Sequence, residues 1–478
     1  MLLFLAEPIA YLFNVFFQEG FLPQDWLKAF ITPVFKSGDA TRPANYRPIS
    51  LTCTLCKIME VIIKDEMVRY LRSQKLISKQ QHAFIQRHST VTNLLECVHD
   101  WNLFLRDRHA VDVIYVDFSR AFDSVVHRKL IAKLSKLGIQ GALLQWICAF
   151  LTNRMQSVVV ENAFSSWVDV ISGVPQGSVL GPILFLLFIN DVTEISDSVT
   201  KFSLFADDIK IYSSMDSVDD CGSLQIALDK LKLWSETWQL GINIHKTYVL
   251  HIGSKNPKTD YYFNGVCLGT VDSARDLGVI VDDCLSFGIH VDSIVSRAYM
   301  RVGVLFKGFV SRDMNLLRQA YITFIRPTLE YASNIWSPYK IKHIRALEKI
   351  QRHFTRRIPV LRELPYADRL ARINLETLEL RRLKSDLVMY YKIQNNLTGL
   401  DPDIYFSESV CSRPTRSSGR TLLDKTLIRN KSLENDFFQR QVSCWNHLPE
   451  QLKRAASVGI FKRQLSQIDF SPFLLINS

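Results

Sequence analysis

The sequence predicts an α+β fold, and three observations lead to this prediction. Short apolar runs rich in β-branched residues, such as Val113–Val116, alternate with longer stretches of helical periodicity along the first 285 residues. From about residue 286 to about residue 395 the pattern is almost wholly helical. The chain has 478 residues, which is too long for one compact domain and suggests two to four.

Composition and charge narrow the class of protein. Hydrophobic residues make up 47% of the chain and charged residues 22%, which excludes a disordered, collagenous or disulfide-scaffold protein. The chain carries 58 Lys and Arg against 47 Asp and Glu, a net charge of +11. A net charge this positive favours an anionic partner, and nucleic acid is a better candidate than a membrane surface.

The N-terminal third begins with an apolar segment, MLLFLAEPIAYLFNVFF. Because Glu7, Pro8 and Asn14 interrupt it, it is shorter than the roughly 20 clean apolar residues of a membrane span, and we expect a packing helix within residues 1–28. Short strands separated by proline- and glycine-containing loops are predicted over residues 31–51. Helices follow at 54–76 and 90–106.

The middle of the chain alternates strands and helices. A buried strand at 113–116 leads to a helix that ends near Gly138, and a second strand covers 156–160. The loop ISGVPQGSVLGP precedes an apolar helix at 183–190, and residues 202–212 read as a β-hairpin followed by a helix at 222–239. Near the C-terminus, the stretch CSRPTRSSGR separates the long helical region from a final helical segment.

Two acidic sites stand at strand ends in apolar surroundings. Asp117 ends the run VIYVD, and Asp207 and Asp208 occupy the tip of the predicted hairpin. Carboxylates beside buried strands are costly to charge unless a cation compensates, and two neighbouring strands could hold two Mg²⁺ ions about 3.5–4 Å apart. Oxygen ligands suit Mg²⁺ or Mn²⁺. The alternative for Asp207 and Asp208 is an ordinary turn, because Asp accepts turn geometry.

Several ordered motifs together resemble the reverse transcriptases of non-LTR (LINE-type) retrotransposons, in particular the jockey and CR1-like group. VDFSRAFDSVVH, SGVPQGSVLGP and FADD resemble the three palm motifs of this family, and FLPQDWLKAFITPVFKSGD, NYRPISL, QHAFIQRHST and RDLGV resemble its other segments. The resemblance extends from about residue 5 to about residue 360. It implies a right-hand polymerase, with fingers and palm at 29–285, a helical basic thumb at 286–360 and a helical region of unknown role at 361–478.

The resemblance also implies roles for individual residues. Asp117, Asp207 and Asp208 correspond to the catalytic carboxylates, and Asp117, Phe118 (through its backbone carbonyl), Asp207 and Asp208 to the metal ligands. Phe122 corresponds to the steric gate that disfavours a ribose 2′-OH, although core packing is the alternative for this ring. The remaining nucleotide-binding residues implied are Lys36, Arg47, Gln176, Gly177 and Lys246.

A basic helix is predicted in the thumb. Residues 290–357 contain 13 Lys and Arg against 4 Asp and Glu, so this window carries +9 of the net +11. Apolar residues from Ile344 to Ile358 fall on one helical face. The opposite face carries Lys342, Arg345, Lys349, Arg352 and Arg356. We expect this face to contact the phosphates of a template–primer duplex, with a solvated basic face as the alternative. Arg87 is a further candidate for the template backbone.

The resemblance implies an RNA-directed DNA polymerase that uses an RNA template, a DNA primer and deoxynucleoside triphosphates with two Mg²⁺ ions, for which Mn²⁺ can substitute. The alternative is a catalytically silent nucleic-acid-binding remnant of such an element; a group II intron maturase or telomerase-type polymerase fits the finger and thumb motifs less well. Met1 falls almost at the start of the polymerase region, so we expect a polymerase-only piece without the upstream endonuclease usual in the family. We expect an intracellular protein of the nucleus or cytoplasm, without a membrane anchor.

Overall fold

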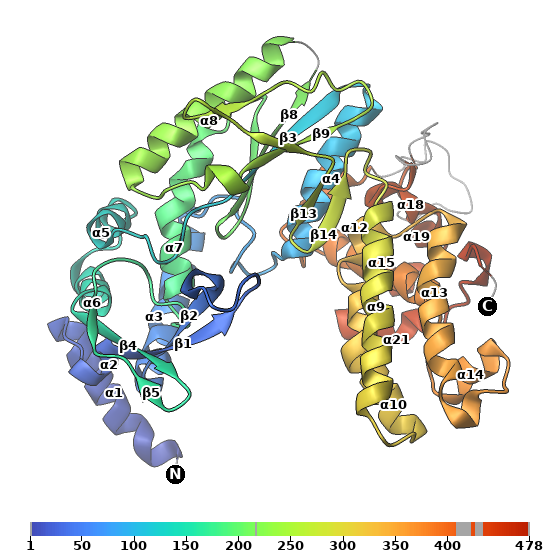
Figure 1. The fold of residues 1–478 in the computed structure, drawn as a ribbon, viewed down its shortest axis with the longest axis horizontal. Coiled ribbons are helices and arrows are strands. Elements are labelled where there is room, and N and C mark those ends of the chain that lie inside the picture. Colours follow the sequence, from blue (N-terminus) through green and yellow to red (C-terminus); the bar gives the residue numbers. More distant parts are fainter. Residues whose placement is uncertain (1, 216–217, 408–421, 426–433, 477–478) are drawn as a thin grey trace.

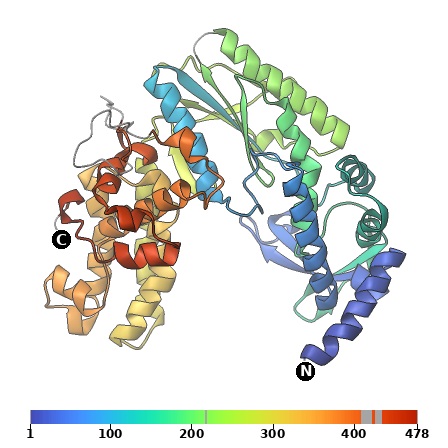
Figure 2. The same cartoon turned by 180° about the vertical axis from the view of Figure 1, so that it is seen from behind.

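The chain forms an arch in which two limbs meet at a central sheet (Figure 1). The computed structural model describes residues 2–215, 218–407, 422–425 and 434–476. One limb is mixed helix and strand and carries the N-terminus, whereas the other limb is helical and carries the C-terminus (Figures 1 and 2). The predicted α+β organisation, followed by helices after about residue 286, is therefore observed. The linker CSRPTRSSGR, at residues 411–420, lies outside the described residues.

The central sheet has five strands in the order β12-β9-β3-β8-β7. Neighbouring strands run antiparallel, except that β12 runs parallel to β9. The middle strand, β3, is buried along its whole length, as its continuous apolar run predicts. The strands are β3 (Ala110–Val116), β7 (Lys201–Phe205), β8 (Asp208–Met215), β9 (Tyr248–Ile252) and β12 (Gly269–Val271).

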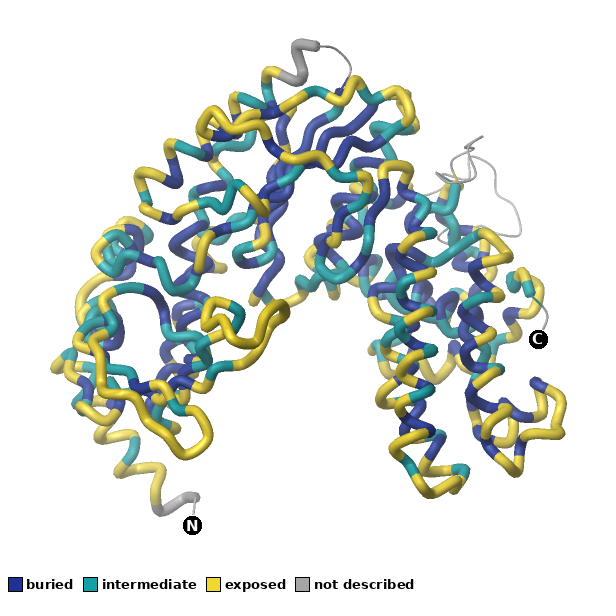
Figure 3. Tube along the Cα trace, in the orientation of Figure 1, coloured by how far each residue is buried: buried dark blue, intermediate teal, exposed yellow. Residues whose placement is uncertain are grey.

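The side chains of alternate residues of β3 pack into two separate hydrophobic cores. Val111, Val113 and Tyr115 pack in one core with α4 (Thr90–Arg106), and this core continues into the helical limb. Ile114 and Val116 point the other way, into a second core that includes α7 (Gly181–Ile189) and α8 (Val218–Trp238). The central strands are accordingly buried in Figure 3, since helices cover both faces of the sheet.

A second sheet forms the mixed limb. Its strand order is β2-β1-β4-β5, and β6 also pairs with β4. A 3-10 turn and loop separate the two antiparallel strands β1 and β2, where the prolines and the glycine predict punctuation. The limb contains β1 (Lys28–Phe35), β2 (Tyr46–Leu51), β4 (Arg154–Val160), β5 (Ala163–Phe164), β6 (Val168–Val170), α2 (Gln24–Leu27), α3 (Thr54–Ser73), α5 (His127–Lys136) and α6 (Gly141–Leu151).

The N-terminal apolar segment is a packing helix, as predicted. Helix α1 (Leu2–Glu19) packs on α6, and its Phe16 ring lies 5.3 Å from the ring of Trp26. Within the described part of the chain, no helix has the length and apolar character needed to cross a bilayer.

A tight hairpin connects the central sheet to the helical limb. Strands β13 (Ser273–Asp276) and β14 (Val279–Asp282) are joined by Leu277 and Gly278, which both have positive φ angles, 44° and 91°. Two positive φ angles are what a type I′ turn requires. The helices that follow are α9 (Gly288–Gly308), α10 (Met314–Ala320), α11 (Arg326–Glu330), α12 (Ser333–Trp336), α13 (Ile341–Arg356), α14 (Tyr366–Arg372) and α15 (Leu378–Gln394).

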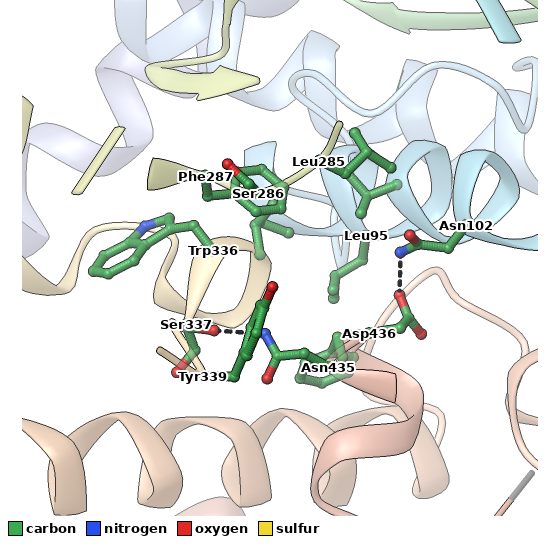
Figure 4. A pocket seen from close by; sticks show the side chains of 13 residues that line it. Leu95, Asn102, Leu285, Ser286, Phe287, Trp336, Ser337, Tyr339, Asn435 and Asp436 are labelled. Carbon is green, nitrogen blue, oxygen red and sulfur yellow. Dashed lines mark hydrogen bonds between the residues drawn. The ribbon is translucent and has the colours of Figure 1, made fainter. Parts of the chain in front are cut away.

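The C-terminal region folds back onto the junction between the helical limb and α4. Asn102 of α4 donates a hydrogen bond to Asp436 (2.9 Å), and Asn435 donates one to the Ser337 carbonyl (2.9 Å) around a small pocket (Figure 4). That pocket holds about 20 Å³, the space of one water molecule, so it is a packing defect at a junction. The region comprises α16 (Pro402–Tyr405), α18 (Phe437–Arg440), α19 (Val442–His447), α20 (Glu450–Lys453) and α21 (Val458–Leu465).

Candidate active site

Three aspartates meet at one end of the central sheet. In the β7–β8 hairpin Phe205 pairs with Asp208, so Ala206 and Asp207 form the turn, with Ala206 at φ 55°. Val116, the last residue of β3, pairs with Ile209, so Asp117, which follows it, lies beside Asp208. The structure thus brings together the three carboxylates that the sequence singles out.

The protein surroundings make all three carboxylates harder to ionise than an ordinary aspartate. Desolvation and, second to it, the neighbouring Asp207 raise the pKa of Asp208 to about 6. Desolvation and the nearby Asp117 raise the pKa of Asp207. Desolvation also raises the pKa of Asp117, against the opposing effect of Lys246 and Lys36. A cluster of carboxylates that resist ionisation is the electrostatic setting that a bound divalent cation relieves.

The donor set fits a hard cation better than a transition metal, because it offers carboxylate oxygens only. The three aspartates do not, however, bring their ligand atoms close enough together for a single ion. Among the described residues, the one group of three His, Cys, Asp or Glu side chains whose ligand atoms all lie within 4.8 Å of one another is Asp282, Asp283 and Cys284. The three catalytic candidates are therefore spread wider than a single small ion needs.

The Phe118 carbonyl faces away from its neighbouring segment. Phe118 bridges to Ile242, and the hydrogen bonds on either side run from Asn243 N to the Asp117 carbonyl (2.7 Å) and from Ser119 N to the Gly241 carbonyl (2.8 Å). Phe118 and Ile242 therefore form a non-hydrogen-bonded antiparallel pair. In such a pair the backbone N–H and C=O groups of each residue point away from the partner segment. The side chain of Phe118 itself is buried.

Basic side chains lie on two sides of the carboxylates. Lys246 Nζ is 3.9 Å from Asp117 Oδ2. Lys36, directly after β1, and Arg47 in β2 are exposed and close enough to lower the pKa of Asp207. Position 47 pairs with Val34 across the β1–β2 hairpin, so this hairpin presents both cations from the mixed limb.

A pocket of about 230 Å³ opens beside Asp117 and Asp208. Lys246 lines it, as do Lys210 of β8 and Arg275, Asp276 and Leu277 of the β13–β14 hairpin. Lys36 and Arg47 are not among its lining residues. The pocket beside the carboxylates is therefore separate from Lys36 and Arg47, and its own basic lining residues are Lys210, Lys246 and Arg275.

The ring of Phe122 is held by packing. It stacks on Phe185 of α7, with ring centroids 4.2 Å apart and planes 19° apart, and it remains half-buried. Both the packing interpretation and the gate interpretation fit this position, because the ring is fixed on one side and accessible on the other.

The VPQG loop links β2 to the segment after β3. The Gln176 carbonyl accepts a hydrogen bond from Ser50 N (2.6 Å), and its side-chain amide donates to Asp123 Oδ1 (2.8 Å). Gly177 has φ 113°, and a Cβ there would lie 2.6 Å from the Ser50 carbonyl oxygen. A side chain at position 177 is therefore excluded by both conformation and space.

The remaining predicted nucleic-acid residues are Arg87 and the basic face of α13. Arg87 is exposed, and its carbonyl accepts a hydrogen bond from Gly399 N (3.0 Å), which ties the QHAFIQRHST segment to the loop after α15. The predicted apolar face of α13 is buried and its basic face is outward, but Arg352 is half-buried, with its guanidinium 4.2 Å from the Tyr366 ring centroid. In both views α9 lies between α13 and the other limb (Figures 1 and 2).

The sequence analysis missed a residue that holds the catalytic turn. The side chain of Gln81 is almost fully buried, and its Oε1 accepts hydrogen bonds from Ala83 N (2.8 Å) and from Ala206 N (3.0 Å). The segment around it also pairs with β7, through His82 N to the Leu204 carbonyl (3.0 Å). Gln81 lies in the quoted QHAF motif, but nothing in the pattern indicates that its side chain reaches the hairpin turn.

Comparison with known proteins decides the family. Residues 34–281, more than half of the chain, match the family model described as reverse transcriptase (RNA-dependent DNA polymerase). The chain belongs to the reverse transcriptase family. The predicted right-hand polymerase fold is therefore confirmed, and the three aspartates lie within the matched range.

Curated relatives with similar sequences are polymerases of transposons and mobile elements. The probable RNA-directed DNA polymerase from transposon BS of Drosophila melanogaster is 29% identical over 78% of the chain and 42% of the relative. The RNA-directed DNA polymerase from mobile element jockey of the same species is 28% identical over 73% of the chain and 39% of the relative. The chain thus spans about two fifths of the length of these relatives.

Among solved structures, telomerase from Candida tropicalis, in complex with a fragment of telomeric RNA, has 10% sequence identity to this reverse transcriptase and a TM-score of 0.44. The match covers 96% of this chain and 67% of the telomerase chain. These values are too low to support an argument about shared detail.

Proposed function

We propose that this chain is an RNA-directed DNA polymerase of a non-LTR retrotransposon. In this reaction the 3′-OH of a DNA primer paired to an RNA template attacks the α-phosphorus of a deoxynucleoside triphosphate, and pyrophosphate leaves. The observation that supports this proposal most is the meeting of Asp117, Asp207 and Asp208 at one sheet end, in a chain of the reverse transcriptase family.

The carboxylates would hold the metal ions. Asp117, Asp207 and, less directly, Asp208 would bind two Mg²⁺ ions, with the Phe118 carbonyl as a further ligand, and Mn²⁺ could replace them. Bound there, the ions would neutralise the charge that develops on the attacking and leaving oxygens. The raised pKa values of the three groups support this assignment, since a cation would offset their repulsion.

Residues of the mixed limb would bind the nucleotide. Lys36 and Arg47 would pair with the triphosphate, which carries more charge than one cation can balance. The Phe122 ring would exclude a ribose 2′-OH, and the backbone around Gln176 and Gly177 would contact the base pair. The Gln176 side-chain amide donates to Asp123 and its carbonyl accepts from Ser50 N, so both groups already have partners that fix the loop.

Lys246 would offer a proton to the leaving pyrophosphate. Its amine lies 3.9 Å from Asp117, which supports a place at the reacting centre. The primer hydroxyl would approach from the open pocket. In an in-line displacement the attacking oxygen lies opposite the leaving group. Lys36 and Arg47, the cations assigned to the triphosphate, are not among the residues that line this pocket, whereas Lys246 is.

The domain assignment follows from the same proposal. Residues 29–285 would be fingers and palm, residues 286–360 the thumb, and 1–28 and 361–478 flanking helical regions. Arg87 and the basic face of α13 (Lys342, Arg345, Lys349, Arg352 and Arg356) would contact template–primer phosphates. An RNA template and deoxynucleotides are found in the nucleus and the cytoplasm, where we propose that the chain acts.

Primer extension tests the proposal. The chain is supplied with a DNA primer on an RNA template, deoxynucleotides and Mg²⁺, and we expect extension that is lost in Asp117→Ala and in Asp207→Ala. Duplex binding without incorporation in either Mg²⁺ or Mn²⁺ would instead support the silent-remnant alternative. Extension that survives both substitutions would contradict the assigned roles.

A further inference from the structure

A buried ion pair lies beside the catalytic carboxylates and has no part in the function proposed above. Lys210 is 3% exposed and Asp276 is 4% exposed. The two residues are 66 positions apart in the sequence and belong to different sheets, β8 and β13. Lys210 Nζ donates to both carboxylate oxygens of Asp276, at 3.1 and 3.0 Å.

Two further buried side chains complete the arrangement. Lys210 Nζ also donates to Asn93 Oδ1 (2.6 Å), and the Tyr115 hydroxyl donates to Asp276 Oδ2 (3.3 Å). These four residues come from β8, β13, α4 and β3. The pair is therefore a junction of four elements in which both charges have several hydrogen-bond partners.

A buried ion pair is a poor way to gain stability alone. Removing two charges from water costs about as much as their attraction returns, and apolar residues of similar volume often stabilise a core equally well. The pair instead fixes how the two elements that carry it lie relative to each other, because the ammonium and the carboxylate must meet at hydrogen-bond distance in one geometry.

The ion pair lies where a fixed geometry can affect the catalytic carboxylates and the pocket beside them. Lys210 follows Asp208 by two residues, so both side chains leave the same side of β8. Asp276 and its neighbours Arg275 and Leu277 line the same pocket as Asp117 and Asp208. The rest of the hairpin is held by the helical limb, through Ile280 N to His290 Nδ1 (3.1 Å) and the Tyr331 hydroxyl to the Leu277 carbonyl (2.8 Å).

We propose that Lys210 and Asp276 are a positioning pair that sets the distance between the hairpin wall and the catalytic carboxylates. This inference rests on the proposed polymerase function, in which the primer hydroxyl enters through that pocket. A wall at a fixed distance places the attacking oxygen, and a displacement of about 1 Å can cost a large factor in rate. Both residues of the pair line that pocket themselves.

The test replaces the pair without leaving one charge buried alone. In the double variant Lys210→Met with Asp276→Leu, we expect the single-turnover rate of incorporation to fall about tenfold or more at saturating nucleotide. The KM for the deoxynucleotide should not change, because Lys36 and Arg47 are untouched. A purely structural role predicts no such separation of rate from KM.

A matched control is present in the helical limb. Arg440 and Asp386 form an equally buried pair, with side chains 7% and 0% exposed, and Asn334 donates to Asp386 (2.9 Å) as a third partner. The double variant Arg440→Met with Asp386→Leu should shift the Tm by a similar amount and leave the single-turnover rate within about twofold of the unmodified chain.

Each outcome of these experiments either supports or overturns the inference. An unchanged rate in a folded Lys210→Met, Asp276→Leu variant overturns the inference, as does an equal loss in the control variant. If the double variant does not fold, Asp276→Asn decides in its place: it retains the shape and one acceptor oxygen, and a rate equal to that of the unmodified chain overturns the inference. If the unmodified chain shows no incorporation, the proposed function fails first, and this inference fails with it.

Discussion

At the scale of single residues, three carboxylates share one sheet end and repel one another. The pKa of Asp208 rises from its ordinary value of 3.8 to about 6 through desolvation and the neighbouring Asp207. The metal-free folded chain therefore binds a proton more tightly than the unfolded chain does. The contribution of Asp208 to the free energy of unfolding is therefore fully present below the ordinary aspartate pKa of 3.8. It is lost as the pH rises through the raised pKa of about 6.

Metal binding should show the reverse dependence on pH. A cation binds the ionised carboxylates, so we expect Mg²⁺ to raise the Tm more at pH 7.5 than at pH 5.0, about one pH unit below the folded pKa of Asp208. Thermal unfolding with and without Mg²⁺ at both pH values measures this. An equal shift at the two pH values, or a full shift in Asp117→Asn, would contradict the metal assignment.

Gln81 offers a second prediction at this scale. Gln81→Met removes the one oxygen that accepts from Ala83 N and Ala206 N, so two buried donors lose their partner. We expect a loss of about 2–4 kcal/mol in the free energy of unfolding and a slower reaction, because the turn that carries Asp207 loosens. Denaturant unfolding and primer extension measure the two effects. Gln81→Glu, which keeps the oxygen, is the control and should lose less.

At the scale of elements, the site depends on a close contact between the VPQG loop and β2. Gly177 allows the loop backbone to approach the Ser50 carbonyl, and the Gln176 carbonyl then accepts from Ser50 N at 2.6 Å. This contact holds β2, and Arg47 with it, against the segment that follows β3. The side of the site that we propose binds the nucleotide is therefore assembled by loop contacts between elements.

Gly177→Ala should break this contact. We expect a loss of about 2–3 kcal/mol in the free energy of unfolding and a higher KM for the deoxynucleotide. Gly265→Ala is a fitting control, because Gly265 also has a positive φ, 75°, but nothing within 4 Å of an added Cβ. If the two variants behave alike, backbone conformation alone accounts for the effect, and the loop contact has no role.

At the scale of the whole molecule, the positive charge gathers in the helical limb, which contains the basic face of α13. The basic face of α13 is outward, yet α9 lies between α13 and the other limb in both views (Figures 1 and 2). Contact between α13 and the duplex therefore stays a prediction. It requires the duplex to reach beyond α9 along the helical limb.

The salt dependence of duplex binding measures this contact. If Lys349 neutralises one phosphate, Lys349→Ala should lower the slope of log Kd against log salt by about 0.9. Lys462→Ala, an exposed lysine of α21, serves as the control and should leave the slope unchanged. Equal slopes for the unmodified chain and Lys349→Ala would show that the face is merely solvated.

Local pattern predicted the elements well because it reports which side of a segment is buried. The helix at 90–106 and the FADD hairpin are observed as expected, and the register of β3 with β8 brings Asp117 to Asp208. The pattern does not report what covers that side. Lys210 meets Asp276, and Gln81 meets Ala206, only because the chain folds back over long separations, so neither contact could be predicted from spacing.

The central claim is that the aspartates at this sheet end make the chain a polymerase. The most direct test is single-turnover incorporation of one deoxynucleotide onto a DNA primer annealed to RNA, by the unmodified chain and by Asp207→Asn, with Mg²⁺. We predict incorporation by the unmodified chain and a loss of about a thousandfold or more in the variant. Equal rates for the two proteins, or no incorporation by either while both bind the duplex, would contradict the claim.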